Sequence, residues 1–245
     1  MEADPRLAEH RRVWDKKPTL RKIYGDYYRR MAEFLGEGVT LEIGSGSGHI
    51  RDHVDQVFTA DILPVPWLDL AADAQKLPFA NESLDNIVML DVLHHIERPM
   101  EFFFEAARVL RPGGRLVMLD PAITPVSRLV YTYFHPEPVD MGAEPLLSDH
   151  RQSGDDPFDS NQAIPTLLFG NAARCAAFEA SFPTLKPVTS QVFGFATYPL
   201  SGGFRDWCFV PTGIVDPLLA IERWCEPIFA RLMGFRLLVA LERVA

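Results

Sequence analysis

Three glycines at alternating positions follow a short apolar run near residue 40. The segment LEIGSGSG, residues 41–48, places Glu42 ahead of Gly44, Gly46 and Gly48. Glycine has no β-carbon, so a backbone with this spacing can turn tightly and approach a ligand closely. A helix that begins after the turn would add unpaired N–H groups. The pattern is typical of a loop that binds a nucleotide-like ligand, although an ordinary strand-to-helix turn would use the same residues.

The spacing of these glycines distinguishes two kinds of ligand. A dinucleotide loop needs G-x-G-x-x-G, and His49 stands where its third glycine would be, which disfavours a nicotinamide oxidoreductase. Glu42 would repel a pyrophosphate, whereas it would suit a cationic ammonium group such as that of S-adenosylmethionine. Asp61, in the segment TADI, can accept both hydroxyls of a ribose, or it can cap its own loop.

Composition and charge indicate which binding partners and which cellular compartment to expect. The chain has 245 residues, a formal net charge of -9 and no long run of Lys and Arg, so binding to nucleic acid is not indicated. Cys175, Cys208 and Cys225 lie far apart without a Cys-x-x-Cys pair, which is typical of a reducing compartment. The N-terminus lacks the apolar core of a signal peptide, and no uncharged apolar run could span a bilayer. We therefore expect a cytoplasmic protein without a transmembrane segment, and peripheral membrane contact stays open.

Apolar runs alternate with helical patterns over residues 39–120. Such alternation predicts βα units and a parallel sheet, and the continuously apolar strands predict cover on both faces. Residues up to about Leu35 carry aromatic side chains spaced for one face of a helix. Residues 135–165 are rich in Pro, Asp, Gly and Ser and predict a long loop. The later segments AARCAAFEASF, VTSQVFGF, Val215–Met233 and FRLLVALERV predict a helix, a strand, a second helix and a final strand.

Five segments occur in an order that resembles the class I S-adenosylmethionine-dependent methyltransferase superfamily. They lie within roughly residues 39–120 and read LEIGSGSG, TADI, DAQKLPF, LDNIVMLDVLHHI and RVLRPGGRLVMLD. The His-His pair after the fourth strand is most similar to the small-molecule, type-11-like branch. The stretch between Gly48 and Asp61 is shorter than in most of the family and leaves room for a helix of about two turns at most.

The resemblance implies a Rossmann-like α/β fold. We expect an open, mostly parallel seven-stranded sheet with helices on both faces and an antiparallel last strand. Residues 1–38 would form an N-terminal helical cap. Residues 39–245 would form the S-adenosylmethionine-binding domain, with C-terminal insertions at about 121–186 and 196–234 that cover the pocket.

The resemblance also implies S-adenosylmethionine as the cofactor and assigns residues to its parts. The methionine end would be lined by residues of the glycine loop and the fourth strand: Glu42, Gly44, Gly46, Gly48, Leu90 and Asp91. Asp61 would hold the ribose, and Ile62 would lie against the adenine. Asp73 would accept a hydrogen bond from the adenine amino group, and Ala74 would offer its backbone to the ring.

His94 and His95 are the candidate catalytic residues. A sulfonium methyl group is already activated, so a base is needed only where the acceptor must lose a proton. Both histidines follow the fourth strand, where open parallel sheets place ligands. Alternatively, one is buried and hydrogen-bonded while the other packs against the cofactor. His49 and His53 have a spacing that could bind a metal, but no third ligand accompanies them, so no metal site is expected.

The sequence leaves the acceptor of the methyl group open. The segment YFHPEPVD, with His135 and Glu137, could shape a pocket or form a solvated loop. The late aromatic residues could wall an apolar site or form a satellite core: Trp207, Phe209, Trp224 and Phe229. We expect methylation at O, N or C of a small or lipid-like molecule. The alternative is a non-catalytic module of the same fold that binds the cofactor without turnover.

Overall fold

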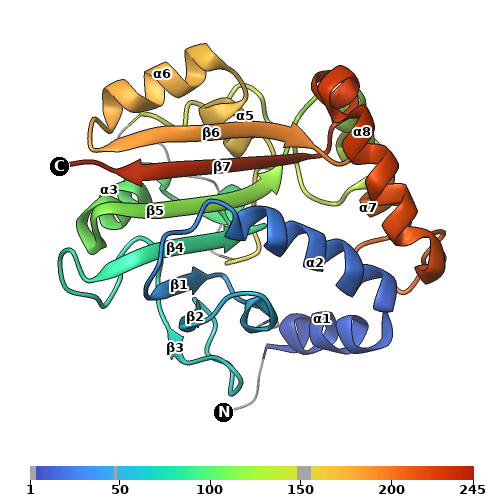
Figure 1. Ribbon diagram of the computed structural model, residues 1–245, viewed down its shortest axis with the longest axis horizontal. Helices are drawn as coiled ribbons and strands as arrows, with labels where there is room; N and C mark the ends of the chain where they lie inside the picture. The colour runs from blue at the N-terminus through green and yellow to red at the C-terminus, as the bar shows by residue number, and fades with distance from the viewer. Residues whose placement is uncertain (1–3, 47–48, 148–155) are drawn as a thin grey trace.

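One sheet of seven strands lies between two layers of helices in the part of the chain that the computed structural model describes, residues 4–46, 49–147 and 156–245 (Figure 1). The strand order is β3-β2-β1-β4-β5-β7-β6. Strands β1 to β5 pair in parallel, whereas β7 pairs antiparallel with β5 and β6. The strands are β1 (Thr40–Ile43), β2 (Val57–Asp61), β3 (Leu70–Ala71), β4 (Leu84–Leu90), β5 (Leu110–Pro121), β6 (Leu185–Phe193) and β7 (Arg236–Arg243). The predicted Rossmann-like fold and its antiparallel last strand are confirmed.

The helices divide between the two faces of the sheet. One core packs α3, α5 and α6 against the strands, and the other packs α2 and α8. The central strands β4, β5 and β7 are buried along most of their length, because both of their faces are covered. The helices are α1 (Pro5–Lys16), α2 (Pro18–Ala32), α3 (Pro99–Val109), α4 (Pro125–Phe134), α5 (Ile164–Phe169), α6 (Ala172–Ser181), α7 (Thr197–Ser201) and α8 (Val215–Met233), with short 3-10 turns η1 (Ile50–Asp52), η2 (Leu93–His95) and η3 (Thr212–Ile214).

The N-terminal segment forms two helices rather than the single helix that we expected. Pro18 disfavours a helical conformation at Lys17, whose φ is -119°, and it occupies the first position of α2. The Lys17 ammonium donates hydrogen bonds of 2.8–2.9 Å to the backbone oxygens of Gly203, Arg205 and Trp207. The break between α1 and α2 is therefore fastened to a loop almost two hundred residues away in sequence.

In its described residues, from 49 onward, the segment between the glycine loop and β2 forms the 3-10 turn Ile50–Asp52 in place of a helix of up to two turns. Ile50 is buried in the same core as Leu20 and Ile23 of α2. Helix α2 thus covers the face of the sheet that a longer helix after the glycine loop would cover. Figure 1 shows α2 crossing in front of β4 and β5.

The segment that follows β5 contains more helix than expected, with α4 at its start and α5 near its end. Helix α4 begins with a capping box in which Thr124 and Ser127 bond to each other's backbone N–H groups. The described part of the expected loop at 135–165 is largely irregular until α5 begins at Ile164. Among the described residues, the helices are all too short or too polar to traverse a bilayer.

Replacing Phe178 tests the aromatic core between α3, α5 and α6. Its ring lies 4.7 Å from those of Phe103 and Phe169, and the side chain is fully buried. We expect Phe178→Ala to lower the free energy of unfolding by about 3–5 kcal/mol, measured by denaturant titration. Phe58→Ala, at a position that is 49% exposed on β2, should cost less than about 1 kcal/mol. Equal losses in the two variants would contradict this packing.

Candidate active site

A cavity of about 1000 Å³ opens at the carboxyl ends of β1, β2 and β4. In an open parallel sheet this edge is where ligands bind. Nearly all of the residues predicted to bind the cofactor line the cavity: Glu42, Gly44, Gly46, Asp61, Ile62, Asp73, Ala74, Leu90 and Asp91. Gly48 lies outside the described residues. Segments far apart in sequence thus converge on one cavity. Its volume is at the upper end of the usual range for ligand pockets, so the cavity is large enough for two small molecules.

The glycine loop bends because two of its glycines adopt left-handed backbone angles. Gly44 has a φ of +68°, and a β-carbon placed there would lie 2.2 Å from a methyl group of Val92. Gly46 has a φ of +48°, and its N–H donates a 3.0 Å hydrogen bond to Asp61 Oδ2. The turn therefore depends on the absence of side chains and is tied to the end of β2.

Glu42 is a buried carboxylate at the carboxyl end of β1. Burial raises its pKa to about 8, although a hydrogen bond from Ser45 acts in the opposite direction. Its Oε2 atom is buried without a hydrogen-bond partner. A carboxylate in this environment gains from a cationic group more than a solvated one would. This arrangement fits a ligand that brings its own ammonium group.

Asp61 caps the loops around it. Its oxygens accept hydrogen bonds from the backbone N–H groups of Gly46 and Leu63, both at 3.0 Å. Loop capping, one of the two roles considered for Asp61, is therefore present in this structure. Each carboxylate oxygen can accept further bonds, so capping leaves acceptor capacity for a ribose. The neighbouring Ile62 is half exposed and lies at the cavity.

Asp73 and Ala74 lie in the turn after β3. One oxygen of Asp73 accepts a 2.9 Å hydrogen bond from the N–H of Gln75, which closes the turn. Ala74 is buried beside it and lines the cavity. Asp61 pairs with Ala71 of β3, so the two strands bring Asp61 and this turn close together.

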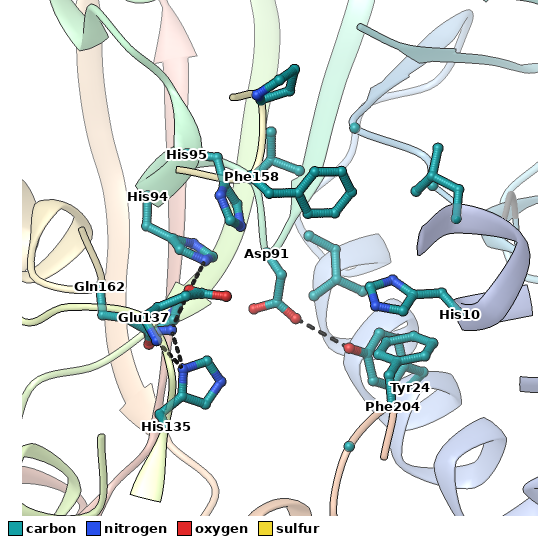
Figure 2. Close-up of a pocket in the computed structure, with 18 of the residues that line it drawn as sticks. His10, Tyr24, Asp91, His94, His95, His135, Glu137, Phe158, Gln162 and Phe204 are labelled. Carbon is teal, nitrogen blue, oxygen red and sulfur yellow. Dashed lines mark hydrogen bonds and ion pairs between the residues drawn. The ribbon is translucent and has the colours of Figure 1, made fainter. Parts of the chain in front are cut away.

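Asp91 lies at the centre of the cavity floor, directly after Leu90 (Figure 2). Its φ is +59°, a left-handed conformation that is rare for a residue with a side chain. Its two oxygens accept bonds from Tyr24 at 3.1 Å and from Arg236 at 2.6 Å. The Arg236 side chain is almost completely buried, with its guanidinium carbon 5.1 Å from the ring of Tyr27. Arg236 was not among the predicted site residues, although an isolated Arg within the apolar strand FRLLVAL was a signal for it.

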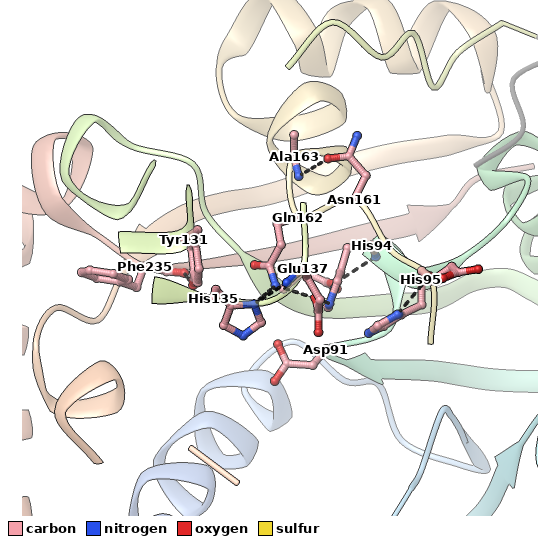
Figure 3. Close-up of polar contacts among 12 residues, drawn as sticks. Asp91, His94, His95, Tyr131, His135, Glu137, Asn161, Gln162, Ala163 and Phe235 are labelled. Carbon is pink, nitrogen blue, oxygen red and sulfur yellow. Dashed lines mark hydrogen bonds and ion pairs between the residues drawn. The ribbon is translucent and has the colours of Figure 1, made fainter. Parts of the chain in front are cut away.

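His94 lies in the opposite wall from Tyr24 and is held between two carboxylates. Its Nδ1 lies 2.7 Å from Asp120 Oδ1, and its Nε2 lies 3.3 Å from Glu137 Oε2 (Figure 3). Burial opposes the charged imidazolium, but hydrogen bonds to Asp120 and Glu137 outweigh it and raise the pKa of His94 to about 10. As expected for one of the pair, His94 is buried and hydrogen-bonded. As a cation it is not available to accept a proton.

His95 has the opposite electrostatic environment. Burial and then the positive charge of His94 lower the pKa of His95 to about 4. Its Nδ1 lies 3.2 Å from the backbone oxygen of Asp159. The two imidazole rings are only 4.1 Å apart between centroids. At neutral pH the wall therefore presents one charged and one neutral imidazole to the cavity.

Glu137 completes this wall. Burial opposes the charged carboxylate, but the hydrogen bond and charge of His94 outweigh it and lower the pKa of Glu137 well below its usual range. Gln162 Nε2 donates a 2.6 Å hydrogen bond to the same carboxylate and lies 3.2 Å from His135 Nδ1. His135, Pro136 and Glu137 thus line the cavity, whereas Pro138 is exposed. Asp120 and Gln162 were not among the predicted site residues, because nothing in their local sequence indicates where they point.

Two further sets of residues were considered from the sequence: the pair His49 and His53, and the late aromatic residues. His49 stacks on Trp14 at 3.9 Å between ring centroids, and His53 stacks on Tyr28 at 5.1 Å. Each ring thus serves packing. Trp207 and Phe209 line the cavity, whereas Trp224 on α8 is 79% exposed. Only part of the late aromatic set therefore walls the pocket.

A pair of glycine variants tests the tight turn. Gly44→Ala combines left-handed strain with the contact to Val92, so we expect a loss of about 3 kcal/mol or more in the free energy of unfolding. Gly46→Ala has similar strain, but its new methyl group would meet nothing closer than 3.8 Å, so about 1–2 kcal/mol is expected. Chemical denaturation measures both. The geometry would be refuted if Gly46→Ala were the more damaging change.

Comparison with known proteins finds a family match over the glycine loop and the strands beside it. Residues 41–118 match the family described as the methyltransferase domain. A demethylmenaquinone methyltransferase of Tropheryma whipplei (strain Twist) is 38% identical over 151 residues, which cover 51% of this chain and 63% of that protein. A ubiquinone/menaquinone biosynthesis C-methyltransferase of Paracoccus denitrificans (strain Pd 1222) is 39% identical over 64 residues, 26% of each chain. The chain therefore spans less than two thirds of the length of these curated relatives.

Solved structures share the whole fold at low sequence identity. The methyltransferase in a complex with the Haloferax volcanii Trm112 methyltransferase activator has a TM-score of 0.54 at 17% identity, covering 99% of this chain and 96% of that one. A SAM-dependent methyltransferase from Archaeoglobus fulgidus has a TM-score of 0.53 at 14% identity, covering 91% and 94%. These likenesses concern the fold alone, and the sequence match over residues 41–118 supplies the motifs. Residues 41–118 therefore carry a methyltransferase domain, within a fold that is shared with a SAM-dependent methyltransferase of known structure.

Proposed function

We propose that the protein binds S-adenosylmethionine at the carboxyl ends of β1, β2 and β4 and transfers its methyl group to a second molecule in the same cavity. The observation that carries this proposal is Glu42, a buried carboxylate with an unpartnered oxygen beside a glycine turn. Residues 39–245 would form the binding domain. The insertions at about 121–186 and 196–234 would supply the acceptor side, and residues 1–38 would cap it.

The residues around the cavity fit the parts of this cofactor in order. We assign the methionine end to Glu42, Gly44, Gly46, Gly48, Leu90 and Asp91. Asp61 would accept the ribose hydroxyls, and Ile62 would pack on the adenine. Asp73 would accept from the adenine amino group, and the backbone of Ala74 would meet the ring. The fit is supported by the shared cavity and by the buried Glu42 oxygen that has no hydrogen-bond partner.

The residues of this chain would contribute mainly by positioning. When bound, S-adenosylmethionine supplies a methyl group that is already activated. Asp91 is fixed by Tyr24 and Arg236, so it offers a rigid floor against which the two ligands can be aligned. We assign His94 and His95 to the acceptor. His94 would donate a hydrogen bond to it, and His95 is the imidazole that can accept a proton.

The acceptor that fits this cavity is a small or lipid-like molecule with an apolar ring. Its support is the aromatic wall of Phe134, Trp207 and Phe209 and the names of the quinone-pathway relatives. We infer a cytoplasmic location from the three free cysteines, with peripheral membrane contact during acceptor binding. The formal charge of -9 argues against nucleic acid as acceptor.

A non-catalytic module that binds the same cofactor is the second candidate, because a fold can keep a binding site after losing its chemistry. The two functions differ in turnover. Formation of S-adenosylhomocysteine in the presence of a quinol-type acceptor supports the enzyme, whereas affinity without any product across a broad acceptor panel supports the binding module.

Calorimetry with S-adenosylhomocysteine tests the cofactor site directly. We expect Asp61→Asn to weaken binding by about 10–100-fold, because one of the two ribose-facing acceptor atoms is lost. Asp55→Asn is the matched control, since Asp55 is exposed and does not line the cavity. Heat of binding that is absent from the folded wild-type protein would overturn the proposed function.

A pH series tests the burial of Glu42. Its pKa is about 8 when folded and near 4.5 when unfolded, so the folded protein retains a proton that the unfolded chain releases between these values. The contribution of Glu42 to stability therefore falls as the pH rises through this window. Denaturant midpoints should show Glu42→Gln gaining stability relative to wild type between pH 5 and pH 8.5.

The control for this series is Glu37→Gln, at an exposed position. Its stability relative to wild type should stay constant over the same range. A difference between Glu42→Gln and wild type that does not change with pH would show that Glu42 is solvated.

A further inference from the structure

We propose that His94, His95 and Glu137 bind one divalent transition-metal ion, such as Zn²⁺, on the acceptor side of the cavity. Each residue offers one ligand atom, and these atoms all lie within 4.8 Å of one another. Two imidazoles and a carboxylate are a ligand set that such ions favour. The three residues come from two segments, the turn after β4 and the segment after α4, which the fold brings together.

The orientation of both imidazoles is what a metal ligand requires. His94 Nδ1 bonds to the Asp120 carboxylate at 2.7 Å, and His95 Nδ1 bonds to the backbone oxygen of Asp159 at 3.2 Å. An oxygen acceptor at Nδ1 fixes a proton there and leaves Nε2 for a metal, which in His94 would displace the second proton of the imidazolium. Metal-binding histidines characteristically have this second partner, either a carboxylate or a backbone carbonyl. Here both kinds occur, one on each ring.

The distance across the site also agrees with a bound ion. His94 Nε2 and Glu137 Oε2 are 3.3 Å apart. Two ligands of a tetrahedral zinc ion with bonds near 2.0–2.1 Å are separated by about 3.3–3.4 Å. Gln162 Nε2 orients the carboxylate through its 2.6 Å hydrogen bond (Figure 3). The ligand atom of His95 lies within 4.8 Å of the other two.

The site has three protein ligands and lines the cavity, so a fourth position faces the bound molecules. This is the arrangement of zinc sites that bind a substrate rather than of purely structural ones. An acceptor with a hydroxyl or enol oxygen would occupy the fourth position, and coordination would lower the pKa of that oxygen. This role of the acceptor rests on the proposed function, whereas metal binding itself does not.

Titration of the metal-stripped protein with Co²⁺ tests the site, because protein-bound Co²⁺ has visible absorption bands that report its ligands. We expect one Co²⁺ per chain, displaced by Zn²⁺. His95→Ala and Glu137→Gln should weaken Co²⁺ binding by at least about 100-fold, more than the loss of an outer hydrogen bond would. His53→Ala is the matched control, because His53 stacks on Tyr28 outside this group and should leave the bands unchanged.

The outcomes separate the metal site from the proposed function. Circular dichroism shows that each variant is folded. If folded wild-type protein binds no Co²⁺, or if the bands survive in His95→Ala and Glu137→Gln, the metal site is wrong even where S-adenosylhomocysteine binds normally. If Co²⁺ binds as expected but S-adenosylhomocysteine does not, the metal site stands and the proposed function fails.

Discussion

A buried guanidinium determines how the floor of the cavity is built. Arg236 belongs to the antiparallel last strand, and its side chain is withdrawn from water beneath the ligand space. An unpaired charge at such depth would be strongly destabilising, so the fold has to supply a carboxylate. Asp91 does so from the end of β4, and Tyr24 of α2 bonds to the other oxygen of that carboxylate. One ion pair therefore joins the middle of the sheet, its late strand and the N-terminal helices.

This interaction also accounts for the unusual backbone at Asp91. A left-handed conformation costs free energy in a residue with a side chain, and it persists only where the surroundings hold it. The position is held by bonds from two different elements. The same turn of the chain then carries His94 and His95 into the cavity wall. The position of the two histidines in the cavity wall thus follows from the ion pair between Asp91 and Arg236 beneath them.

Most of the fold could be predicted from the sequence because its signals are local. Apolar runs over residues 39–120 indicated the strands, and the motif order indicated how they are arranged. The break at Pro18 was missed because the predicted helix rested on the spacing of residues that all follow it, from Tyr24 to Phe34, although a proline is the usual sign of a new helix. The single turn after the glycine loop reflects cover by α2, a tertiary effect that no local pattern reports.

The candidate site was predictable on one side only. Residues of the glycine loop, and Asp61 and Asp73 after the next strands, occur at places that the motifs specify. The other side depends on long-range contacts, because Glu137 meets His94 across more than forty residues of chain. The sequence indicated that Asp120 ends an apolar strand, but it did not indicate that His94 would be the partner of Asp120. Burial and pairing of charges, rather than spacing, decide which acidic residues face the ligands.

The ammonium of Lys17 connects the junction of α1 and α2 to a distant loop. It bonds to three carbonyl oxygens of the loop that carries Phe204 and Trp207, at the point where α1 meets α2. Helix α1 contributes Leu7, His10 and Trp14 to the rim of the cavity on the side of the glycine loop. A swing of α1 away from the sheet would therefore pull on the aromatic loop as well. Departure of the molecule at one end of the cavity and the shape offered to the molecule at the other end would be coupled through Lys17 and through the neighbouring contacts of Arg12 with Asp206 and of His10 with Phe204.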